Sequence, residues 1–353
     1  MNKKLLFSIP LIACLLTSCK GETHYSEDKY ELGIQWVDSA SEDFRILQLC
    51  DIHLGQSDIY EKHFKLMDKT IRDADADLIV LNGDSFTYAD KGVVTKLFSF
   101  IDSYQIPWTF TYGNHDDQGY YSDTYIQEVL GSKKNLYQYA KFINLADDDV
   151  TGRSNFVINI YDRSKDADGK FVNTNLFQVY LLESHNYNFD TWKYDFIKQD
   201  QIDWYERMVK YYTDELTGYV TPSVMYFHVP LPEFFSAWDE YKNGVTTHNV
   251  KLIMGEMTEF SGGPLPESDL HLFDKVKDLG STLAISCAHD HNNDSVINYD
   301  GINLCFGVHA TDRIYYDANK IGGQVIVIDH EDPTHKTLKY ENIYHTYDEV
   351  EGK

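Results

Sequence analysis

The sequence is poor in cysteine and in basic residues. Its 353 residues include 5 cysteines. Setting aside Cys14 and Cys19 near the start leaves Cys50, Cys287 and Cys305, an odd number at dispersed positions. This arrangement argues against a disulfide framework. All three lie in apolar runs, where a free cysteine behaves as a small buried hydrophobe, so we assign them no chemistry.

The shortage of basic residues argues against whole classes of ligand. Lys and Arg together number 31 against 56 Asp and Glu, a formal net charge of -25. Such a charge argues against nonspecific binding to nucleic acid or to anionic lipid surfaces. An anionic ligand would have to be attracted by a local positive site. The length and the hydrophobic content of 42% are sufficient to bury a sizeable core.

The apolar stretch near the start is too short to cross a bilayer. It runs from Leu5 to Leu16 after the basic pair Lys3 and Lys4, a pattern typical of a signal peptide. Its end, Leu16-Thr17-Ser18-Cys19, resembles the bacterial lipobox, in which the cysteine is lipidated. We therefore expect a signal peptide over 1–19, lipidation of Cys19, and anchoring to a bacterial membrane on its periplasmic or cell-surface face. The alternative is an ordinary signal peptide with an incidental cysteine.

The rest of the chain divides into a tether, one domain and a short tail. Residues 20–43 are polar and acidic and predict a tether, 44–345 predict the domain, and 346–353 predict a polar C-terminal tail. In the domain, apolar runs and helical spacing alternate. The pattern predicts strands at 44–50, 78–81 and 108–112, with helices at 60–72 and 93–101 between them. Such an order is typical of an α/β fold with parallel strands.

The second half of the domain has a different pattern. Two strands at 156–161 and 176–182, joined by a polar stretch with the turn signal Asp168-Gly169, predict a hairpin. A helix at 201–212 and four further strands follow, at 224–227, 283–286, 302–306 and 324–328.

Five polar clusters stand where a predicted strand ends. They are Asp51-Ile52-His53, Gly83-Asp84, Gly113-Asn114-His115-Asp116, His228 and His289-Asp290-His291. In open α/β sheets, active sites form outside the carboxyl ends of the strands, so clusters far apart in sequence can meet there. Any one of them alone is more often a capping or structural group. Together they are rich in carboxylate and imidazole and lack thiolate, which is what a binuclear transition-metal site requires.

These blocks resemble the calcineurin-like metallophosphoesterase family, whose pattern is D-x-H, G-D, G-N-H-[DE], a single H, and G-H-x-H. All five occur in order, and only Ala288 replaces the usual glycine. The segments around His228 (226–234) and after His289 (289–294) resemble the small purple-acid-phosphatase-like branch. Purple enzymes carry a tyrosine ligand three residues after the G-D aspartate. Here Thr87 takes that position and Tyr88 follows it, which argues against ligation of iron(III) by tyrosine.

The resemblance implies a fold and a set of ligands. The fold would be α/β, with two packed central β-sheets flanked by helices in four layers. One metal would be held by Asp51, His53 and His291, the other by Asn114, His228 and His289, and Asp84 would bridge them. The expected cofactors are two divalent or mixed-valence transition metal ions, Fe, Mn or Zn. A metal-bridging hydroxide would attack the phosphorus of a phosphate ester.

His115 is the expected general acid, because it adjoins a ligand without being one in the family. The alternative role for His115 is a hydrogen bond that orients a ligand. Among other polar residues, we single out Tyr112, Glu233 and His309 as substrate neighbours. Surface or loop roles are at least as plausible for Glu183, His185, Glu256 and Glu259.

Three functions fit these observations. The first is a phosphatase acting on monoesters, and the second is a phosphodiesterase acting on cyclic nucleotides or small phosphodiesters. The third is a surface binding lipoprotein that keeps the fold without activity, and the complete ligand set argues against it. The expected partners are a small phosphorylated substrate and, through the anchor, a membrane. The acidic charge argues against nucleic acid, and no protein partner is inferred.

Overall fold

The computed structural model describes residues 32–55, 60–119, 121–137, 150–165, 168–188, 193–213, 218–245, 247–260 and 270–351. The predicted signal peptide, Cys19 and most of the predicted tether lie outside these residues. Within them, no helix is long and apolar enough to cross a membrane. Cys50, Cys287 and Cys305 are free and buried, as expected.

Strands from both ends of the domain build a five-stranded sheet. Its order is β15 (Leu338–Tyr344), β14 (Gly322–Ile328), β2 (Phe44–Leu49), β3 (Leu78–Asn82) and β4 (Trp108–Thr111). Strands β2, β3 and β4 are parallel, whereas β14 runs antiparallel to both of its neighbours. Every residue of β3 is buried, as expected for a continuous apolar strand that is covered on both faces.

Strand β1 and the strands between 156 and 306 build an eight-stranded sheet. Its order is β1 (Gly33–Gln35), β5 (Phe156–Lys165), β6 (Phe171–Leu181), β9 (Ser223–Tyr226), β11 (Thr282–Cys287), β13 (Ile302–Phe306), β12 (Val296–Tyr299) and β10 (Lys251–Met254). The centre, β6-β9-β11-β13, is parallel. A two-stranded sheet of β7 (Tyr187–Asn188) and β8 (Lys193–Tyr194) follows β6.

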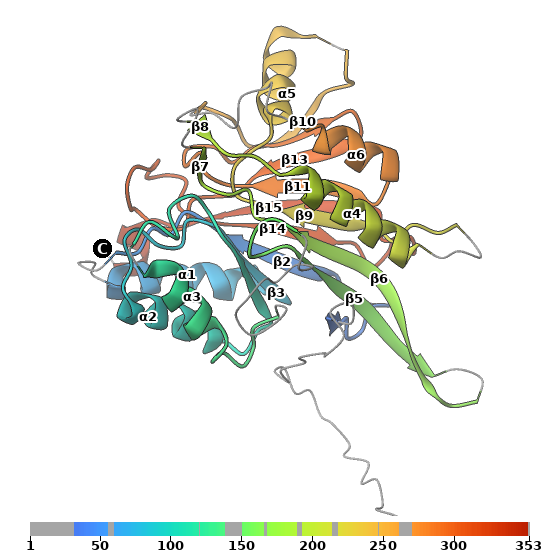
Figure 1. The fold of residues 1–353 in the computed structure, drawn as a ribbon, viewed down its shortest axis with the longest axis horizontal. Helices are drawn as coiled ribbons and strands as arrows, with labels where there is room; N and C mark the ends of the chain where they lie inside the picture. The colour runs from blue at the N-terminus through green and yellow to red at the C-terminus, as the bar shows by residue number, and fades with distance from the viewer. Residues whose placement is uncertain are drawn as a thin grey trace, which may run out of the picture.

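The two sheets pack face to face, and helices cover their outer faces (Figure 1). Side chains alternate along each strand, so Ile79 and Leu81 pack beneath the helices while Leu78 and Val80 pack against the other sheet. The helices over the five-stranded sheet are α1 (Tyr60–Ala74), α2 (Lys91–Asp102) and α3 (Ser122–Leu130). Those over the eight-stranded sheet are α4 (Gln199–Tyr212), α5 (Pro232–Asn243) and α6 (Leu272–Leu279). The predicted four-layer α/β fold is confirmed.

The structure differs from the expected boundaries at both ends of the domain. Strand β1 lies within the range predicted as a tether, and it pairs in parallel with β5. Its neighbour Trp36 is buried and contacts the ring of Phe44, so the end of the acidic segment is folded. At the other end, α7 (Tyr347–Glu351) forms inside the predicted polar tail. The Tyr347 hydroxyl donates a 2.9 Å hydrogen bond to Asp312 Oδ1.

The predicted hairpin forms, but its two strands extend beyond the apolar residues that predict it. Strands β5 and β6 continue into the polar stretch as a ribbon that projects from the sheet (Figure 1). The outer residues of the ribbon are mostly exposed, so no alternation of apolar residues marks them. Gly169 lies in the turn with φ +77°, a left-handed conformation that favours glycine.

Candidate metal centre

The predicted ligands meet at the carboxyl ends of strands from both sheets. Asp51, Asp84 and Asn114 follow β2, β3 and β4 of the five-stranded sheet, and His228 and His289 follow β9 and β11 of the other. All of these side chains, with those of His53 and His291, are buried. The structure therefore gathers the seven predicted ligand residues at the carboxyl ends of the strands, where the two sheets adjoin.

Asp51, His53 and His291 form the first group, with ligand atoms within 4.8 Å of one another. The Nε2 atoms of His53 and His291 lie 3.1 Å apart, and His291 Nε2 is 3.6 Å from Asp51 Oδ1. His291 Nδ1 donates to the Tyr315 carbonyl at 2.7 Å, so its Nε2 carries a lone pair. Two facing imidazole nitrogens beside a carboxylate are the donor set of a transition metal.

Asp84, His228 and His289 form the second group, within the same 4.8 Å limit. His228 Nδ1 donates to the Asn82 carbonyl at 3.0 Å, which aims Nε2 at the group. Asn114 Oδ1 lies 3.0 Å from His289 Nδ1, next to this group as predicted. His289 Nε2 and Asn114 Nδ2 are buried and make no hydrogen bond. Buried polar atoms without partners are costly, and a bound metal ion would remove that cost at the imidazole nitrogen.

Two carboxylate oxygens lie within 4 Å of both groups, and Asp84 Oδ2 is nearer to them than Asp51 Oδ1, which is 3.6 Å from His291 Nε2 and 3.8 Å from His228 Nε2. Asp84 Oδ2 lies 3.1 Å from His228 Nε2 in the second group and 3.6 Å from His53 Nε2 in the first. Its other oxygen, Oδ1, accepts a 2.7 Å hydrogen bond from the backbone N–H of His115. This geometry fits the predicted bridging role of Asp84.

The charges of the centre favour ligation. Burial lowers the pKa of His289 to about 3 and holds the pKa of His53 well below its ordinary value. Both imidazoles are therefore neutral, the form that ligates metals. Burial also opposes the charge on His228, but Asp84 and Asp51 offset it and raise the pKa of His228 to about 9. A metal ion would take the place of that proton as the partner of the two carboxylates.

The backbone at the ligands is strained. Asp51, His53, Asp84 and His289 all have positive φ, which non-glycine residues adopt at a cost of about 1–3 kcal/mol. Such values persist where the surrounding structure holds them, and they often mark functional sites. The glycines of the motifs allow close packing here. A Cβ on Gly83 would lie 2.4 Å from His228 Nδ1.

His115 stands at the edge of the centre. Its side chain is 27% exposed, whereas those of the ligands are almost completely buried, and its Nε2 is 4.0 Å from Asp84 Oδ2. A solvent-accessible imidazole beside a bridging carboxylate can exchange protons with a bound molecule. The next residue, Asp116, accepts hydrogen bonds from the backbone N–H groups of Phe86 and Gly113.

Of the three predicted substrate neighbours, two are buried and one is half-buried. Tyr112 is buried, and its hydroxyl donates to Asp123 Oδ1 at 2.8 Å. His309 is also buried, with its ring 4.3 Å from that of His291, and its Nδ1 donates to the Thr311 carbonyl at 2.5 Å. Glu233 is half-buried in the first turn of α5.

Further residues lie around the centre, and two of them, Tyr194 and Tyr315, are not among the residues singled out from the sequence. The Thr87 hydroxyl lies 2.9 Å from His53 Nδ1, so the residue at the purple-enzyme tyrosine position contacts a ligand. The next side chain, Tyr88, is 62% exposed. Tyr315 stacks on His291 at 4.1 Å, and Tyr194 meets His289 edge-on at 4.3 Å. No motif marks these tyrosines in a sequence with 27 of them.

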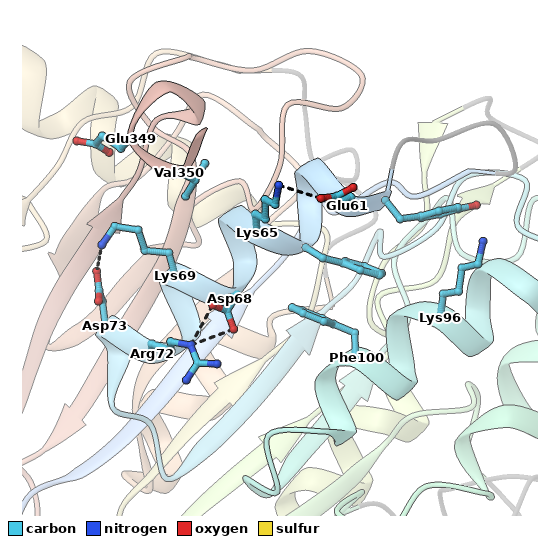
Figure 2. A pocket seen from close by; sticks show the side chains of 12 residues that line it. Glu61, Lys65, Asp68, Lys69, Arg72, Asp73, Lys96, Phe100, Glu349 and Val350 are labelled. Atoms are coloured by element: carbon cyan, nitrogen blue, oxygen red, sulfur yellow. Dashed lines mark hydrogen bonds and ion pairs between the residues drawn. The ribbon is translucent and has the colours of Figure 1, made fainter. Parts of the chain in front are cut away.

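Two other features lie apart from the seven ligand residues. Asp43, Asp329 and His330 form a third group of possible ligands, but the Lys339 ammonium already lies 3.0 Å from Asp329 Oδ2. A hollow of about 980 Å³ lies between α1, α2 and α7 (Figure 2). Ion pairs such as Lys65–Glu61 and Arg72–Asp68 line it, and its lining contains no histidine or cysteine.

Several known proteins resemble this chain. A sequence model described as "Calcineurin-like phosphoesterase" matches residues 44–293. The chain is 27% identical to "Probable inactive purple acid phosphatase 29" of Arabidopsis thaliana, over 92% of this chain and 85% of that protein. It is also 27% identical to "Phosphatase DCR2" of Saccharomyces cerevisiae, over 75% of this chain and 47% of that protein. Purple acid phosphatase PPD1 from yellow lupin superposes with a TM-score of 0.45 at 13% identity, over 87% of this chain and 53% of that one.

Proposed function

Because this chain belongs to the calcineurin-like phosphoesterase family, we propose that it hydrolyses phosphate monoesters with two bound transition-metal ions. The observation that carries the proposal is the pair of buried ligand groups that share Asp84. Two carboxylates facing two divalent ions leave a local excess of positive charge. That excess can hold a phosphate although the chain as a whole has a net charge of -25.

The donor set suits iron, manganese or zinc. Asp51, His53 and His291 would hold one ion, Asn114, His228 and His289 the other, and Asp84 both. Imidazole and carboxylate without thiolate favour these borderline metals. Bound ions would clamp the ester oxygens and lower the pKa of a coordinated water from about 15.7 toward about 7.

His115 is proposed to protonate the leaving group. Its exposed side chain lies at the edge of the metal groups, and its backbone N–H holds Asp84 in place at 2.7 Å. An alkoxide of high pKa needs a proton as the ester bond breaks, and a positioned imidazole can supply it. The proton would pass from an imidazole nitrogen of His115 to the leaving oxygen.

The proposed activity is tested by metal analysis combined with a substrate panel. Purified protein would be assayed with p-nitrophenyl phosphate, bis-p-nitrophenyl phosphate and nucleotides, before and after chelation and reloading with Fe, Mn or Zn. We expect metal-dependent hydrolysis with faster turnover of the monoester. Faster hydrolysis of the diester would show that the enzyme is a phosphodiesterase and not a phosphatase. Metal binding without hydrolysis of any substrate would favour a binding protein and refute the enzyme.

We also propose that the chain is exported and anchored through a lipid on Cys19. The support is the sequence Leu16-Thr17-Ser18-Cys19 after a short apolar stretch. An anchored phosphatase would meet small phosphorylated substrates outside the cytoplasm. Mass spectrometry of the mature N-terminus tests this directly, because lipidation adds acyl chains to Cys19 and a plain signal-peptide cleavage does not.

A further inference from the structure

A partly exposed arginine joins the two sheets next to the loop that carries His115, with 26% of its side chain exposed. Arg153 lies just before β5, and its principal partner, Glu183, lies just after β6 of the same eight-stranded sheet. Its other partners, Asp117 and Asp123, follow β4 of the five-stranded sheet. We call these four residues the Arg153 clamp.

The guanidinium makes directed contacts with all three carboxylates. Arg153 Nη2 is 2.7 Å from Glu183 Oε1 and 3.2 Å from Asp117 Oδ2, and Nη1 is 3.2 Å from Asp123 Oδ1. The guanidinium carbon also lies 4.0 Å from the centre of the Tyr112 ring. The planar fork of arginine fits such a set, and lysine, a point charge, could not make all of these contacts.

The clamp holds the loop that carries His115. Asp117 is two residues beyond His115, and its Oδ1 accepts a 2.9 Å hydrogen bond from Asn186. On the side of the metal centre, the backbone N–H of His115 donates a hydrogen bond to Asp84 Oδ1. The loop is therefore tied to the metal centre at one end and to the Arg153 clamp at the other, while the His115 side chain between them is 27% exposed and meets the His53 ring edge-on.

The energetics make this attachment strong. Glu183 is buried, and burial alone would raise its pKa, but Arg153 holds the pKa of Glu183 below its ordinary value. The Glu183 carboxylate is buried, so breaking its pair with Arg153 would leave an uncompensated buried charge. Asp117 is 21% exposed, and Arg153 keeps two other carboxylate partners, so this link between clamp and loop can be cut without burying a lone charge.

We propose that Arg153 is a positioning residue that holds His115 at the leaving group through Asp117. The inference rests on the proposed general-acid role of His115. A proton donor works only within hydrogen-bond reach of its acceptor, and a displacement of about 1 Å can cost about 100-fold in rate. The clamp thus matters for substrates whose leaving group needs a proton and not for those that leave unaided.

The test is a double-mutant cycle with two substrates. Arg153→Met and Asp117→Ala would each be made in the parent protein and in His115→Ala, and assayed on an alkyl phosphate and on p-nitrophenyl phosphate. Asp117→Ala covers the case in which Arg153→Met does not fold. Arg45→Met is the matched control, because Arg45 makes a similar paired contact with Glu341 at the opposite end of β2.

We expect kcat on the alkyl phosphate to fall by about 10-fold or more, with a loss below about threefold on the nitrophenyl ester and two metals retained. In the His115→Ala background, the same changes should have no further effect. Equal losses on both substrates, an additional loss without His115, or no loss at all would overturn the inference. If His115→Ala itself does not distinguish the substrates, the general-acid assignment fails first and the positioning role fails with it.

Discussion

Replacing Asp84 should show whether it ligates both metal ions, because the loss of an ordinary ligand should weaken mainly one. Asp84→Asn keeps the shape of the side chain and an oxygen that can accept the His115 N–H, but it removes the negative charge between the two groups. Asp51→Asn is the matched variant, because Asp51 is a member of the first group and its Oδ1 lies 3.8 Å from His228 Nε2 of the second, farther than Asp84 Oδ2 at 3.1 Å. The bridging geometry predicts that the first change weakens both metal ions and the second mainly one.

The size of the effect follows from Coulomb's law. Ligand nitrogens of both groups lie within 4 Å of Asp84 Oδ2, at 3.1 and 3.6 Å, so each ion would bind close to this oxygen. A unit charge at about 4 Å contributes about 4 kcal/mol per unit of partner charge at an effective dielectric constant near 20. Since about 1.4 kcal/mol is tenfold in affinity, each ion should bind about 1,000-fold more weakly or worse.

Metal content decides the question without any activity assay. Each protein would be stripped with a chelator, titrated with Zn²⁺ or Mn²⁺ against a competing indicator, and measured by elemental analysis. We expect two ions per parent chain, about one for Asp51→Asn, and fewer than one for Asp84→Asn. Two ions retained with unchanged affinity in Asp84→Asn, or the loss of a single ion as in Asp51→Asn, would refute the shared-ligand reasoning.

Four further outcomes are expected. His115→Ala should lower kcat on an alkyl phosphate by about 10²- to 10⁴-fold and far less on p-nitrophenyl phosphate; parallel losses with reduced metal content would indicate a ligand-orienting role instead. Cys19→Ser made in a bacterial host should leave the membrane fraction after a carbonate wash, and retention there would place the anchor elsewhere. Phe98 packs against Phe86, Trp108 and Phe110, so Phe98→Ala should cost about 3–5 kcal/mol in urea unfolding, whereas Phe171→Ala, at an exposed ribbon position, should cost little. Because the folded-state pKa of Glu183 is lowered, its charge stabilises the fold above the ordinary carboxyl range, and this contribution is lost as the pH falls through the folded pKa. The stability advantage of the parent over Glu183→Gln should therefore shrink on acidification, and a thermal-unfolding difference that is independent of pH would contradict it.

The gathering of the candidate ligands could be predicted from the sequence because each block follows an apolar strand. Runs such as 44–50 and 78–81 identify strands, and the polar residue after each run must lie at the end of its strand. Parallel strands bring those ends to one edge, so Asp51 and Asp84 meet for topological reasons. The family resemblance then assigns the remaining partners from the second sheet.

The Arg153 clamp could not be predicted in the same way. Arg153 lies in a polar segment with no strand or helix pattern, and Glu183 follows a strand in the same manner as many surface residues. Arg153 and Glu183 flank the paired strands β5 and β6, but their contacts with Asp117 and Asp123 depend on where a segment after β4 of the other sheet meets them, which no local spacing encodes. The same holds for β1, whose three residues are too few to give a periodic signal.

A site with ligands on two sheets also requires that the sheets do not slide past each other. Three buried amides meet this need: Gln48, Asn82 and Gln324, from adjacent strands of the five-stranded sheet, donate hydrogen bonds to backbone carbonyls of the other sheet. In the sequence each of them only interrupts or ends an apolar run. Apolar contacts between sheets tolerate small shifts, whereas a buried amide that loses its acceptor incurs the full cost of an unsatisfied polar group. These amides therefore fix the register of the two sheets, and with it the separation of Asp84 from His228.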